Sequence, residues 1–390
     1  MKKLLLALLL ALTVATFFLI EKKQVKSDTY ETRAVYFSYI EFQNYIQGKT
    51  EEESKENIKE VLDNIKKINF NRIIVHVRPF SDSIYISKYY PTSKYILNDK
   101  DVYPNYDVLE YFINEAHKRN IKFDAWINPY RISNLKNETE NSVYKKYSSR
   151  GNAKITENGM YLNPASEEVQ TLIVNGIKEI VINYDVDGIH FDDYFYPDKK
   201  IDLKSYEEYI KDNPNINLND FRLNNVKTLI KKVYKSIKEI KPKVEFGIAP
   251  EGNIDNCYDN SYLDVKEILE KSEYVDYIMP QIYYGFNNQV RPFKDTVNDW
   301  KSLIKNEKIK LIPALSFYKV GTSDKYAGSG VNEWLENDNI ISKEIEYLKN
   351  NKKYNGFSLF SYNYIFNDKY KNDKSNLELE SINNILKVNP

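Results

Sequence analysis

Cysteine and glycine are scarce in this chain, which has 1 Cys and 12 Gly among its 390 residues. A single cysteine, Cys257, excludes an intramolecular disulfide framework and any cysteine-based zinc cluster. An excess of charge of either sign is also missing, because 56 Lys and Arg balance 56 Asp and Glu. This balance excludes a strongly basic nucleic-acid-binding protein and a polybasic membrane-surface protein. A low-complexity disordered polymer is excluded as well, since 42% of the residues are hydrophobic.

Tyrosine, by contrast, is abundant: the chain has 34 Tyr together with 18 Phe and 3 Trp. An aromatic ring with a polar tip suits two environments, a half-buried surface and a sugar-binding cleft in which a flat apolar face meets hydroxyl groups. The composition alone is compatible with both.

The N-terminus has the pattern of an export signal. Lys2 and Lys3 precede an uncharged run, Leu4–Ile20, and a charged segment begins at Glu21. The run lies at the lower limit of roughly 17 to 25 residues for spanning a bilayer. We therefore expect residues 1–27 to be a signal peptide or an uncleaved membrane anchor, and the rest of the chain to be extracytoplasmic, either membrane-anchored or secreted. The alternative is a buried N-terminal helix of the domain.

Residues 28–390 contain no linker rich in Pro, Gly or Ser and are expected to form one domain. Eight apolar runs of strand length alternate there with amphipathic segments, which predicts a parallel sheet closed into a (β/α)8 TIM barrel. The runner-up, a doubly wound open sheet, would need a glycine-rich first turn for a cofactor, and the sequence has none. The predicted strands are Ala34–Tyr39, Arg72–Arg78, Lys122–Asn128, Asp187–Asp192, Val244–Ala249, Tyr274–Tyr283, Lys310–Phe317 and Gly356–Ser361, and the clearest helices are Glu51–Ile68, Val108–Arg119, Glu167–Tyr184 and Phe221–Ile240, the last capped by Asn219 or Asp220.

Long polar segments follow the third, fourth and seventh predicted strands, at 131–163, 197–218 and 319–338. In a (β/α)8 barrel, such loops after the strands form the face that carries the chemistry. Residues two apart along a strand share a face, so the apolar rows are expected to face the helices. The inner rows then become polar or aromatic toward the carboxyl ends of the strands: Ile74, His76 and Arg78; Asp124, Trp126 and Asn128; His190 and Asp192; Gly247 and Ala249, which lead to Glu251; and Tyr277, Met279, Gln281 and Tyr283.

A polar inner row has two interpretations. One is a substrate site. The other is a self-satisfied polar core in which Arg78 pairs with an aspartate and nothing reacts. Buried polar groups without partners cost roughly 1–3 kcal/mol each, so either interpretation requires contacts for them. The position of the polar residues at one end of the barrel, beside Trp and Tyr, favours a site.

Several long strings in the sequence resemble family ten of the glycosyl-hydrolase-like domains, over residues 33 to 362. The resemblance implies a (β/α)8 barrel in exported or envelope-attached bacterial proteins, and hydrolysis of peptidoglycan glycan stripped of its stem peptides. Members of this family often carry a non-acidic residue where this chain has Glu251, so a catalytic role for Glu251 does not follow from it. The strings are VHVRPF at 75–80, NYDVLE at 105–110, EAHKR at 115–119, AWINPYR at 125–131, YDVDGIHFDDYFYP at 184–197, FGIAP at 246–250 and MPQIYY at 279–284.

Glycoside hydrolysis requires a carboxylic acid that protonates the leaving oxygen and a carboxylate that acts as nucleophile or base. Asp192, on the inner row at the end of a central strand, is the best candidate, and Asp193 follows it on the turn. Two adjacent carboxylates raise one of the two pKa values, which suits an acid–base pair. Glu251, one strand further round the barrel, is by position the natural second acid, and Glu41, at the end of the first predicted strand, is a weaker reserve.

Ten further residues are expected to contact sugar or to orient the acids. Rings are expected to stack on sugar, amides to bind hydroxyl groups, and His190 to orient Asp192 or a sugar hydroxyl, while Asp193 reaches the pocket or pairs with Arg78 or Arg131. The ring candidates are Trp126, Tyr130, Tyr194, Tyr283 and Tyr284, and the amide candidates are Asn128 and Gln281.

The sequence thus predicts a glycoside hydrolase that acts on cell-wall glycan by carboxylate chemistry, as a monomer, with no cofactor or metal, and with membrane contact only through residues 1–27. One alternative is a metal-dependent polysaccharide deacetylase, in which His190, Asp192 and Asp193 hold a cation with His76 as the remaining candidate ligand. The other is a non-catalytic glycan-binding barrel.

Overall fold

The computed structural model describes residues 31–351 and 353–387, and the part from Thr32 onward is one compact unit. The predicted leader, residues 1–27, lies outside the described residues. A search of the described residues finds no helix that is both long and apolar enough to cross a membrane.

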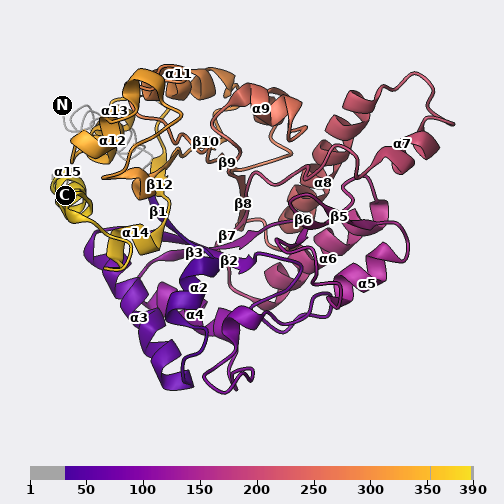
Figure 1. The fold of residues 1–390 in the computed structure, drawn as a ribbon, viewed down its shortest axis with the longest axis horizontal. Helices are drawn as coiled ribbons and strands as arrows, with labels where there is room; N and C mark the ends of the chain where they lie inside the picture. Colours follow the sequence, from indigo (N-terminus) through magenta and orange to yellow (C-terminus); the bar gives the residue numbers. More distant parts are fainter. Residues whose placement is uncertain (1–30, 352, 388–390) are drawn as a thin grey trace, which may run out of the picture. The chain divides into compact units, whose positions relative to one another are not determined.

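One parallel sheet runs through this unit, and the helices lie around it (Figure 1). Its strand order is β10-β9-β8-β7-β3-β2-β1-β12-β11, and its paired strands are all parallel. The strands are β1 (Thr32–Phe37), β2 (Arg72–Arg78), β3 (Lys122–Ile127), β7 (Gly188–Phe191), β8 (Glu245–Ile248), β9 (Tyr277–Ile278), β10 (Lys310–Leu311), β11 (Ala314–Leu315) and β12 (Gly356–Leu359).

Each predicted strand is present. Strand β2 has its predicted bounds, β1 is shifted by two residues, and β3, β7, β8 and β12 are one or two residues shorter than predicted. Two strands differ more. The sixth, predicted over residues 274–283, is confined to β9, and the seventh, predicted over 310–317, is divided into β10 and β11. Pro280 follows β9 closely and Pro313 lies between β10 and β11. Because proline has no backbone N–H to donate, it interrupts a hydrogen-bonded ladder.

The two ends of the sheet meet in one chain segment, residues 310–315. On one side, the N–H of Ile312 donates to the carbonyl of Ile278 at 3.0 Å. On the other side, the N–H of Ser358 donates to the carbonyl of Pro313 at 3.0 Å. The sheet is therefore curled, and its first and last strands in the order are consecutive pieces of the same segment.

The helices begin where the sequence supplies caps. Helix α3 (Glu51–Lys67) starts with a capping box, because Thr50 accepts from the N–H of Glu53 while the Glu53 side chain accepts from the N–H of Thr50. Helix α8 starts at Leu218 with Asn217 as its cap, so the predicted cap at Asn219 or Asp220 is wrong by two or three residues. The longer helices are α3, α4 (Val108–Lys118), α6 (Glu167–Asn183), α8 (Leu218–Ile240), α11 (Phe293–Leu303), α13 (Ile340–Lys349) and α15 (Asp373–Lys387).

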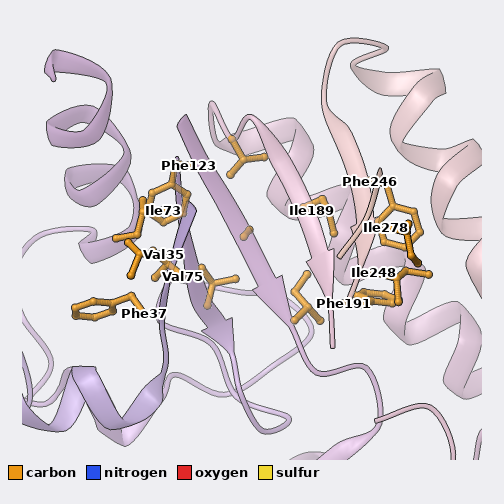
Figure 2. Close-up of a cluster of buried hydrophobic side chains, with 14 of the residues drawn as sticks. Val35, Phe37, Ile73, Val75, Phe123, Ile189, Phe191, Phe246, Ile248 and Ile278 are labelled. Carbon is orange, nitrogen blue, oxygen red and sulfur yellow. The ribbon is translucent and has the colours of Figure 1, made fainter. Parts of the chain in front are cut away.

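The outer face of the sheet forms the main core under these helices. Alternate residues of adjacent strands lie in one apolar layer, as Figure 2 shows for Val35, Ile73, Phe123, Ile189 and Phe246. Short helices complete the connections: α2 (Tyr39–Tyr45), α5 (Ser142–Ser148), α7 (Leu203–Tyr209), α9 (Ile254–Asp259), α10 (Val265–Glu270), α12 (Glu333–Glu336) and α14 (Tyr362–Phe366).

The long segment after β3 is more ordered than the polar loop predicted over residues 131–163. It contains a three-stranded antiparallel sheet of β4 (Arg131–Ser133), β6 (Gly159–Leu162) and β5 (Ala153–Thr156). Gly159 has a φ of +126°, and a Cβ there would lie 2.2 Å from the carbonyl oxygen of Ser133. Only glycine fits this close approach, which fixes β4 and hence Arg131 at the carboxyl end of β3.

Candidate active site

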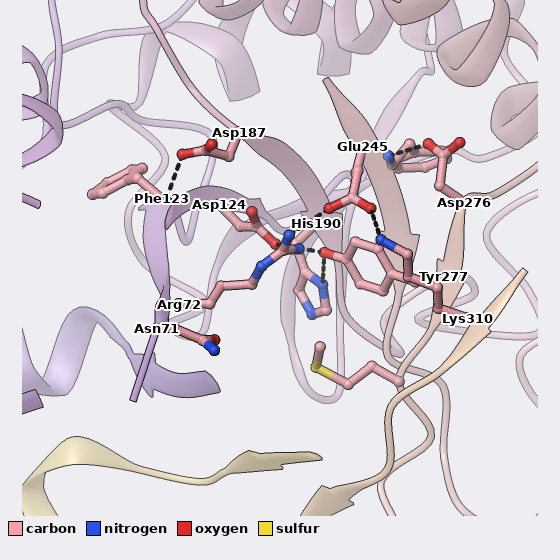
Figure 3. A network of polar contacts seen from close by, with 12 residues as sticks. Asn71, Arg72, Phe123, Asp124, Asp187, His190, Glu245, Asp276, Tyr277 and Lys310 are labelled. Atoms are coloured by element: carbon pink, nitrogen blue, oxygen red, sulfur yellow. Dashed lines mark hydrogen bonds and ion pairs between the residues drawn. The ribbon is translucent and has the colours of Figure 1, made fainter. Parts of the chain in front are cut away.

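A network of paired charges lies inside the curled sheet, near the amino ends of its strands (Figure 3). The guanidinium of Arg72 contacts Asp124 at 2.9 Å and also contacts Glu245. The Tyr277 hydroxyl donates to Asp124 at 2.8 Å, and Lys310 contacts Glu245 at 2.5 Å. Burial raises the pKa of Glu245, but the two cations outweigh burial and hold it at about 2. The self-satisfied polar core considered from the sequence therefore exists, but its arginine is Arg72.

His190 belongs to this network. Its Nδ1 lies 3.0 Å from the Tyr277 hydroxyl, and its Nε2 lies 3.1 Å from the Tyr36 hydroxyl. Burial, with the charge of Arg72 as a second cause, lowers its pKa to about 3, so the ring is neutral. Because tyrosine hydroxyls contact both ring nitrogens, the structure does not bring His190 to Asp192 or to a sugar hydroxyl, as the sequence predicted.

A cavity of about 280 Å³ lies above this network, toward the carboxyl ends of the strands. Seven of the residues predicted for the site line it: Trp126, Arg131, Asp192, Asp193, Tyr194, Gln281 and Tyr283. Most of the remaining lining comes from strands whose faces could not be assigned from sequence and from the loops after them, namely Tyr36, Ser38, Tyr39, Ile40, Tyr318 and Phe360, together with His76 and Ala249.

Asp192 lies at the wall of the cavity and is only 4% exposed. Its Oδ2 accepts from the indole N–H of Trp126 at 3.1 Å and from the Asn128 amide at 3.3 Å, and its Oδ1 accepts from the backbone N–H of Tyr194 at 3.3 Å. Burial, and next the charge of Asp193, raise the pKa of Asp192 to about 7, while Arg131 and the hydrogen bonds oppose the shift. Near neutral pH this group is therefore poised between its acid and its base form.

Asp193 lies beside Asp192 and is half-buried. Burial raises its pKa, and the negative charge of Glu251 adds to the effect, whereas Gln281 and Arg131 lower it. The guanidinium of Arg131 lies 4.8 Å from the centre of the Tyr194 ring. A cation held under an aromatic ring next to two carboxyl groups allows one of them to be ionised.

Glu251 is close enough to raise the pKa of Asp193, but it does not line the cavity. Its Oε2 accepts from the Asn256 amide at 2.9 Å. Glu41, the weaker reserve, is fully buried and caps helix α2, with contacts to the hydroxyls of Ser38 and Ser361. Glu41 therefore has a structural role, and Asp193 is the carboxylate nearest to Asp192 in the cavity lining.

Arg78 is not at the cavity, and the prediction of its inward direction is wrong. The pairing of β2 with β3 shifts between His76 and Arg78, so Val77 is an extra residue in β2. This bulge turns Arg78 outward, where its guanidinium lies 4.2 Å from the centre of the Tyr90 ring. A Cβ added to Gly176 of helix α6 would lie 2.5 Å from the Nη1 of Arg78, so the glycine leaves room for this guanidinium.

Three other predicted contacts lie behind or beside the cavity. Tyr130 is fully buried in the outer core, so it does not present a ring to a ligand. Asn128 holds Asp192 from behind and does not line the cavity. Tyr284 lines a neighbouring cavity that also contains Tyr283. These three residues therefore do not line the cavity that contains the carboxyl pair.

His76 is the main functional candidate missing from the predicted site set. It is 1% exposed, lines the cavity and stacks on Trp126 with 3.7 Å between ring centres and 6° between ring planes. Burial and the charge of Arg131 lower its pKa well below the usual value. Neither ring nitrogen has a hydrogen-bond partner among the described residues. The inner row predicted from β2 already contained this residue, beside Trp126 on the next strand.

The deacetylase-like metal site is not assembled. His190 faces tyrosine hydroxyls, and the described residues contain no group of three or more His, Cys, Asp or Glu side chains placed to hold a metal ion.

Comparisons with known proteins agree with the sequence resemblance. Residues 31–329 match the family model described as Glycosyl hydrolase-like 10. The chain is 32% identical to Glycosyl hydrolase YngK of Bacillus subtilis over 326 residues, covering 77% of this chain and 63% of that protein. It is 31% identical to Glycosyl hydrolase DigH of Escherichia coli over 336 residues, covering 78% of this chain and 74% of that protein. The chain thus spans less than two thirds of the length of YngK.

Solved glycosidase structures share the fold. The PgaB (BpsB) glycoside hydrolase domain from Bordetella bronchiseptica matches with a TM-score of 0.57 and 11% identity, over 92% of this chain and 100% of that domain. An Anoxybacillus alpha-amylase matches with a TM-score of 0.57 and 11% identity, over 92% of this chain and 79% of that protein. At these identities, the likeness extends to the fold alone.

Proposed function

Because this chain belongs to the glycosyl hydrolase-like 10 family, we propose that it hydrolyses glycosidic bonds in bacterial cell-wall glycan, with peptide-stripped peptidoglycan strands as substrate. The observation that carries the proposal is the pair Asp192 and Asp193 at one wall of an aromatic cavity, with the pKa of Asp192 raised to about 7. The proposal includes a (β/α)8 barrel, and the curled parallel sheet whose two ends both bond to residues 310–315 supports it.

In this proposal, Asp192 is the general acid. With a pKa near 7, a large fraction of the group carries a proton at neutral pH and can give it to the oxygen of the leaving sugar. Trp126 and Asn128 fix its Oδ2 from behind, so the proton sits on a positioned group. Asp193, in its ionised form, either attacks the anomeric carbon as the nucleophile or takes a proton from the water that attacks this carbon. Glu251 is the reserve for this second role.

The remaining lining of the cavity suits a sugar. Trp126, Tyr194 and Tyr283 supply ring surface, and Gln281 supplies an amide. His76 supplies two ring nitrogens that lack partners in the described part of the chain. A buried polar atom without a partner costs about 1–3 kcal/mol, and a sugar hydroxyl in the cavity would remove that cost. We therefore assign His76 to hydroxyl recognition.

The location of the protein is part of the proposal. The basic start and the uncharged run Leu4–Ile20 support export, and residues 1–27 are proposed as a signal peptide or anchor that leaves residues 28–390 outside the cytoplasm. A cell-wall substrate is reached only from that side of the membrane.

Amidase-treated peptidoglycan tests the proposed function. The full-length chain is expected to release new reducing ends from it, and Asp192→Asn is expected to lower the rate at least a hundredfold with an unchanged unfolding curve near pH 4. Asp368→Asn is the matched control, because the Asp368 side chain is 97% exposed and its ion pair is with the nearby Lys371 on the surface. A wild-type chain that binds the glycan without cutting it would instead support the non-catalytic glycan-binding barrel. Mass spectrometry of the released ends identifies which bond is cut.

A further inference from the structure

A second cavity of about 310 Å³ adjoins the site, and Tyr283 lines both. The second cavity has aromatic residues from two different loops. Tyr284 follows Tyr283 after β9, and Tyr326 comes from the loop after β11. Tyr326 is 77% exposed, although such a ring is usually at least partly covered. The second cavity thus contains an exposed ring together with a ring shared with the site, and extends the aromatic surface beyond the first cavity. We call this second space the Arg291 cavity, after its arginine.

Two of the charged residues that line the Arg291 cavity are paired with each other. Lys319 and Asp324 form a close pair at 2.7 Å, with side chains 17% and 5% exposed. Lys319 also donates to the carbonyl of Tyr283 at 2.7 Å. This pair is neutral and has its contacts within the protein. It holds the loop after β11 against the loop after β9, so both sides of the cavity are fixed.

Arg291 is the cation that stays available. Its side chain is 22% exposed, and only its Nη2 makes a side-chain hydrogen bond in the described part of the chain, to Asp255 at 2.9 Å. The Asp255 side chain is 78% exposed, so solvent screens this pair strongly. A guanidinium has five N–H donors in a fixed fork, and a carboxylate can accept two of them in parallel.

The backbone holds Arg291 in place. The Asn288 side chain is buried, and its Oδ1 accepts from the N–H of Val290 at 3.1 Å and from that of Arg291 at 2.9 Å. The N–H of Gln289 donates to the carbonyl of Ala327 at 2.9 Å, which ties this turn to the loop that carries Tyr326. The cationic fork and the exposed ring are therefore parts of one ordered wall.

From this geometry we infer that the Arg291 cavity binds the neighbouring sugar of the same glycan and that Arg291 recognises a carboxylate on that sugar. The inference rests on the proposed glycan hydrolysis and adds the position and the charge of a second subsite. In a peptide-stripped peptidoglycan strand, every second sugar carries a lactyl carboxylate. A uronic acid would offer the same group from its ring, so the experiment includes both sources.

Binding of matched tetrasaccharides tests the inference. The protein is the full-length chain with Asp192→Asn, so that bound sugar is not turned over. The probes are a peptide-free tetrasaccharide of alternating N-acetylglucosamine and N-acetylmuramic acid, the neutral tetramer of N-acetylglucosamine, and a hyaluronan tetrasaccharide. Calorimetry is expected to show about tenfold tighter binding of the lactyl tetrasaccharide than of the neutral one, as for one charge-assisted contact. Adding Arg291→Gln is expected to remove that difference and to leave the affinity for the neutral tetramer unchanged.

Two control variants accompany Arg291→Gln. Arg150→Gln removes an exposed positive charge that contacts Glu168 and lines neither cavity, and it is expected to keep the tenfold preference. Tyr326→Ala removes an exposed ring and is expected to weaken the binding of the lactyl tetrasaccharide and of the neutral tetramer by the same factor. If hyaluronan gains affinity through Arg291 as the lactyl tetrasaccharide does, the subsite recognises carboxylates in general. If hyaluronan gains nothing, the subsite is specific for the lactyl group.

The inference is overturned if Arg291→Gln keeps the preference, or if it weakens the charged and neutral tetrasaccharides equally. This result is distinguishable from failure of the proposed function. A wild-type chain that cuts no glycan, with the Arg291-dependent preference intact, refutes hydrolysis only. A wild-type chain that cuts the glycan but has no such preference refutes the second subsite only.

Discussion

The Asp192→Asn variant is expected to be more stable than the wild type at alkaline pH, although it loses activity. Asp192 is 4% exposed, and burial together with the charge of Asp193 raises its pKa to about 7. The same group has a pKa of about 3.9 in an unfolded chain. A carboxyl group that binds its proton more tightly when folded weakens the fold as it ionises.

The sign and size of the stability change follow from the difference between the pKa of Asp192 in the folded chain and its pKa in the unfolded chain. Between about pH 4 and about pH 7 the folded chain holds the proton that the unfolded chain has lost, so stability falls as the pH rises. A difference of about 3 pKa units corresponds to about 4 kcal/mol at 1.36 kcal/mol per unit. Asparagine has the same shape and no charge, and its carbonyl oxygen can still accept from Trp126. The protonated carboxyl group also has a single carbonyl oxygen, so asparagine matches it at about pH 4 and gains the full amount, about 4 kcal/mol, above pH 7.

Urea unfolding of the two proteins, followed by tryptophan fluorescence at about pH 4 and about pH 8, measures this gain. We expect equal stability at the lower pH and the full gain at the higher pH. Asp368→Asn, in the exposed position, should show no gain at either pH. A variant that is less stable than the wild type at the higher pH would refute the reasoning. In that case, Arg131 and the three hydrogen bonds would be stabilising the ionised form of Asp192 by more than burial disfavours it.

Four further outcomes are expected. The kcat/KM for glycan should fall about tenfold per pH unit above about pH 7, as Asp192 loses its proton; a flat profile to pH 9 would contradict its role as the acid. In a comparison of second acids, Asp193→Asn should lower kcat at least a hundredfold and Glu251→Gln less than tenfold, and the reverse order would exchange their roles. His76→Phe keeps the stack on Trp126 but not the ring nitrogens, so KM should rise about tenfold with kcat nearly unchanged and no loss of thermal stability. Arg72→Met leaves the buried Asp124 without its cation and Glu245 with Lys310 alone, and should destabilise the fold by about 3–5 kcal/mol in thermal or urea unfolding; a loss under 1 kcal/mol would mean that Arg72 is not needed to stabilise the buried Asp124.

The side chains that face the interior could be predicted where a strand is regular and its polar and apolar residues alternate clearly. Trp126, His190 and Met279 face the interior, and their apolar neighbours face the helices, as the period of two requires. The rule failed at Arg78, because one extra residue in a bulge reverses the side to which every later residue points. Arg72 shares the row of His76, so extending that row by two residues toward the start of β2 would have found the arginine of the buried network.

The rest of the site could not be predicted, because it depends on strands with two apolar faces and on loops. Tyr36 on β1 and Phe360 after β12 line the cavity, but a row without alternation does not indicate its inner face. Tyr318 and Tyr39 reach the cavity from short connections after the strands, whose directions depend on tertiary contacts. The antiparallel sheet within 131–163 was missed for a related reason, since strands of three or four residues leave little periodicity in a polar segment.

The pKa values of two carboxyl groups inside the same sheet are shifted in opposite directions, and the difference lies in the partners of each group. Glu245 contacts Arg72 and Lys310, and its pKa is held at about 2. Asp192 accepts hydrogen bonds only from uncharged donors, and its pKa rises to about 7. A group like Glu245 has no proton to give at neutral pH, and its charge is already neutralised, so it is suited to holding strands together. A group like Asp192, which is buried, lies at a cavity and has only part of its charge offset by Arg131, is suited to giving a proton to a substrate. The charge of the partners therefore separates Glu245, which stabilises the fold, from Asp192, which is proposed to react.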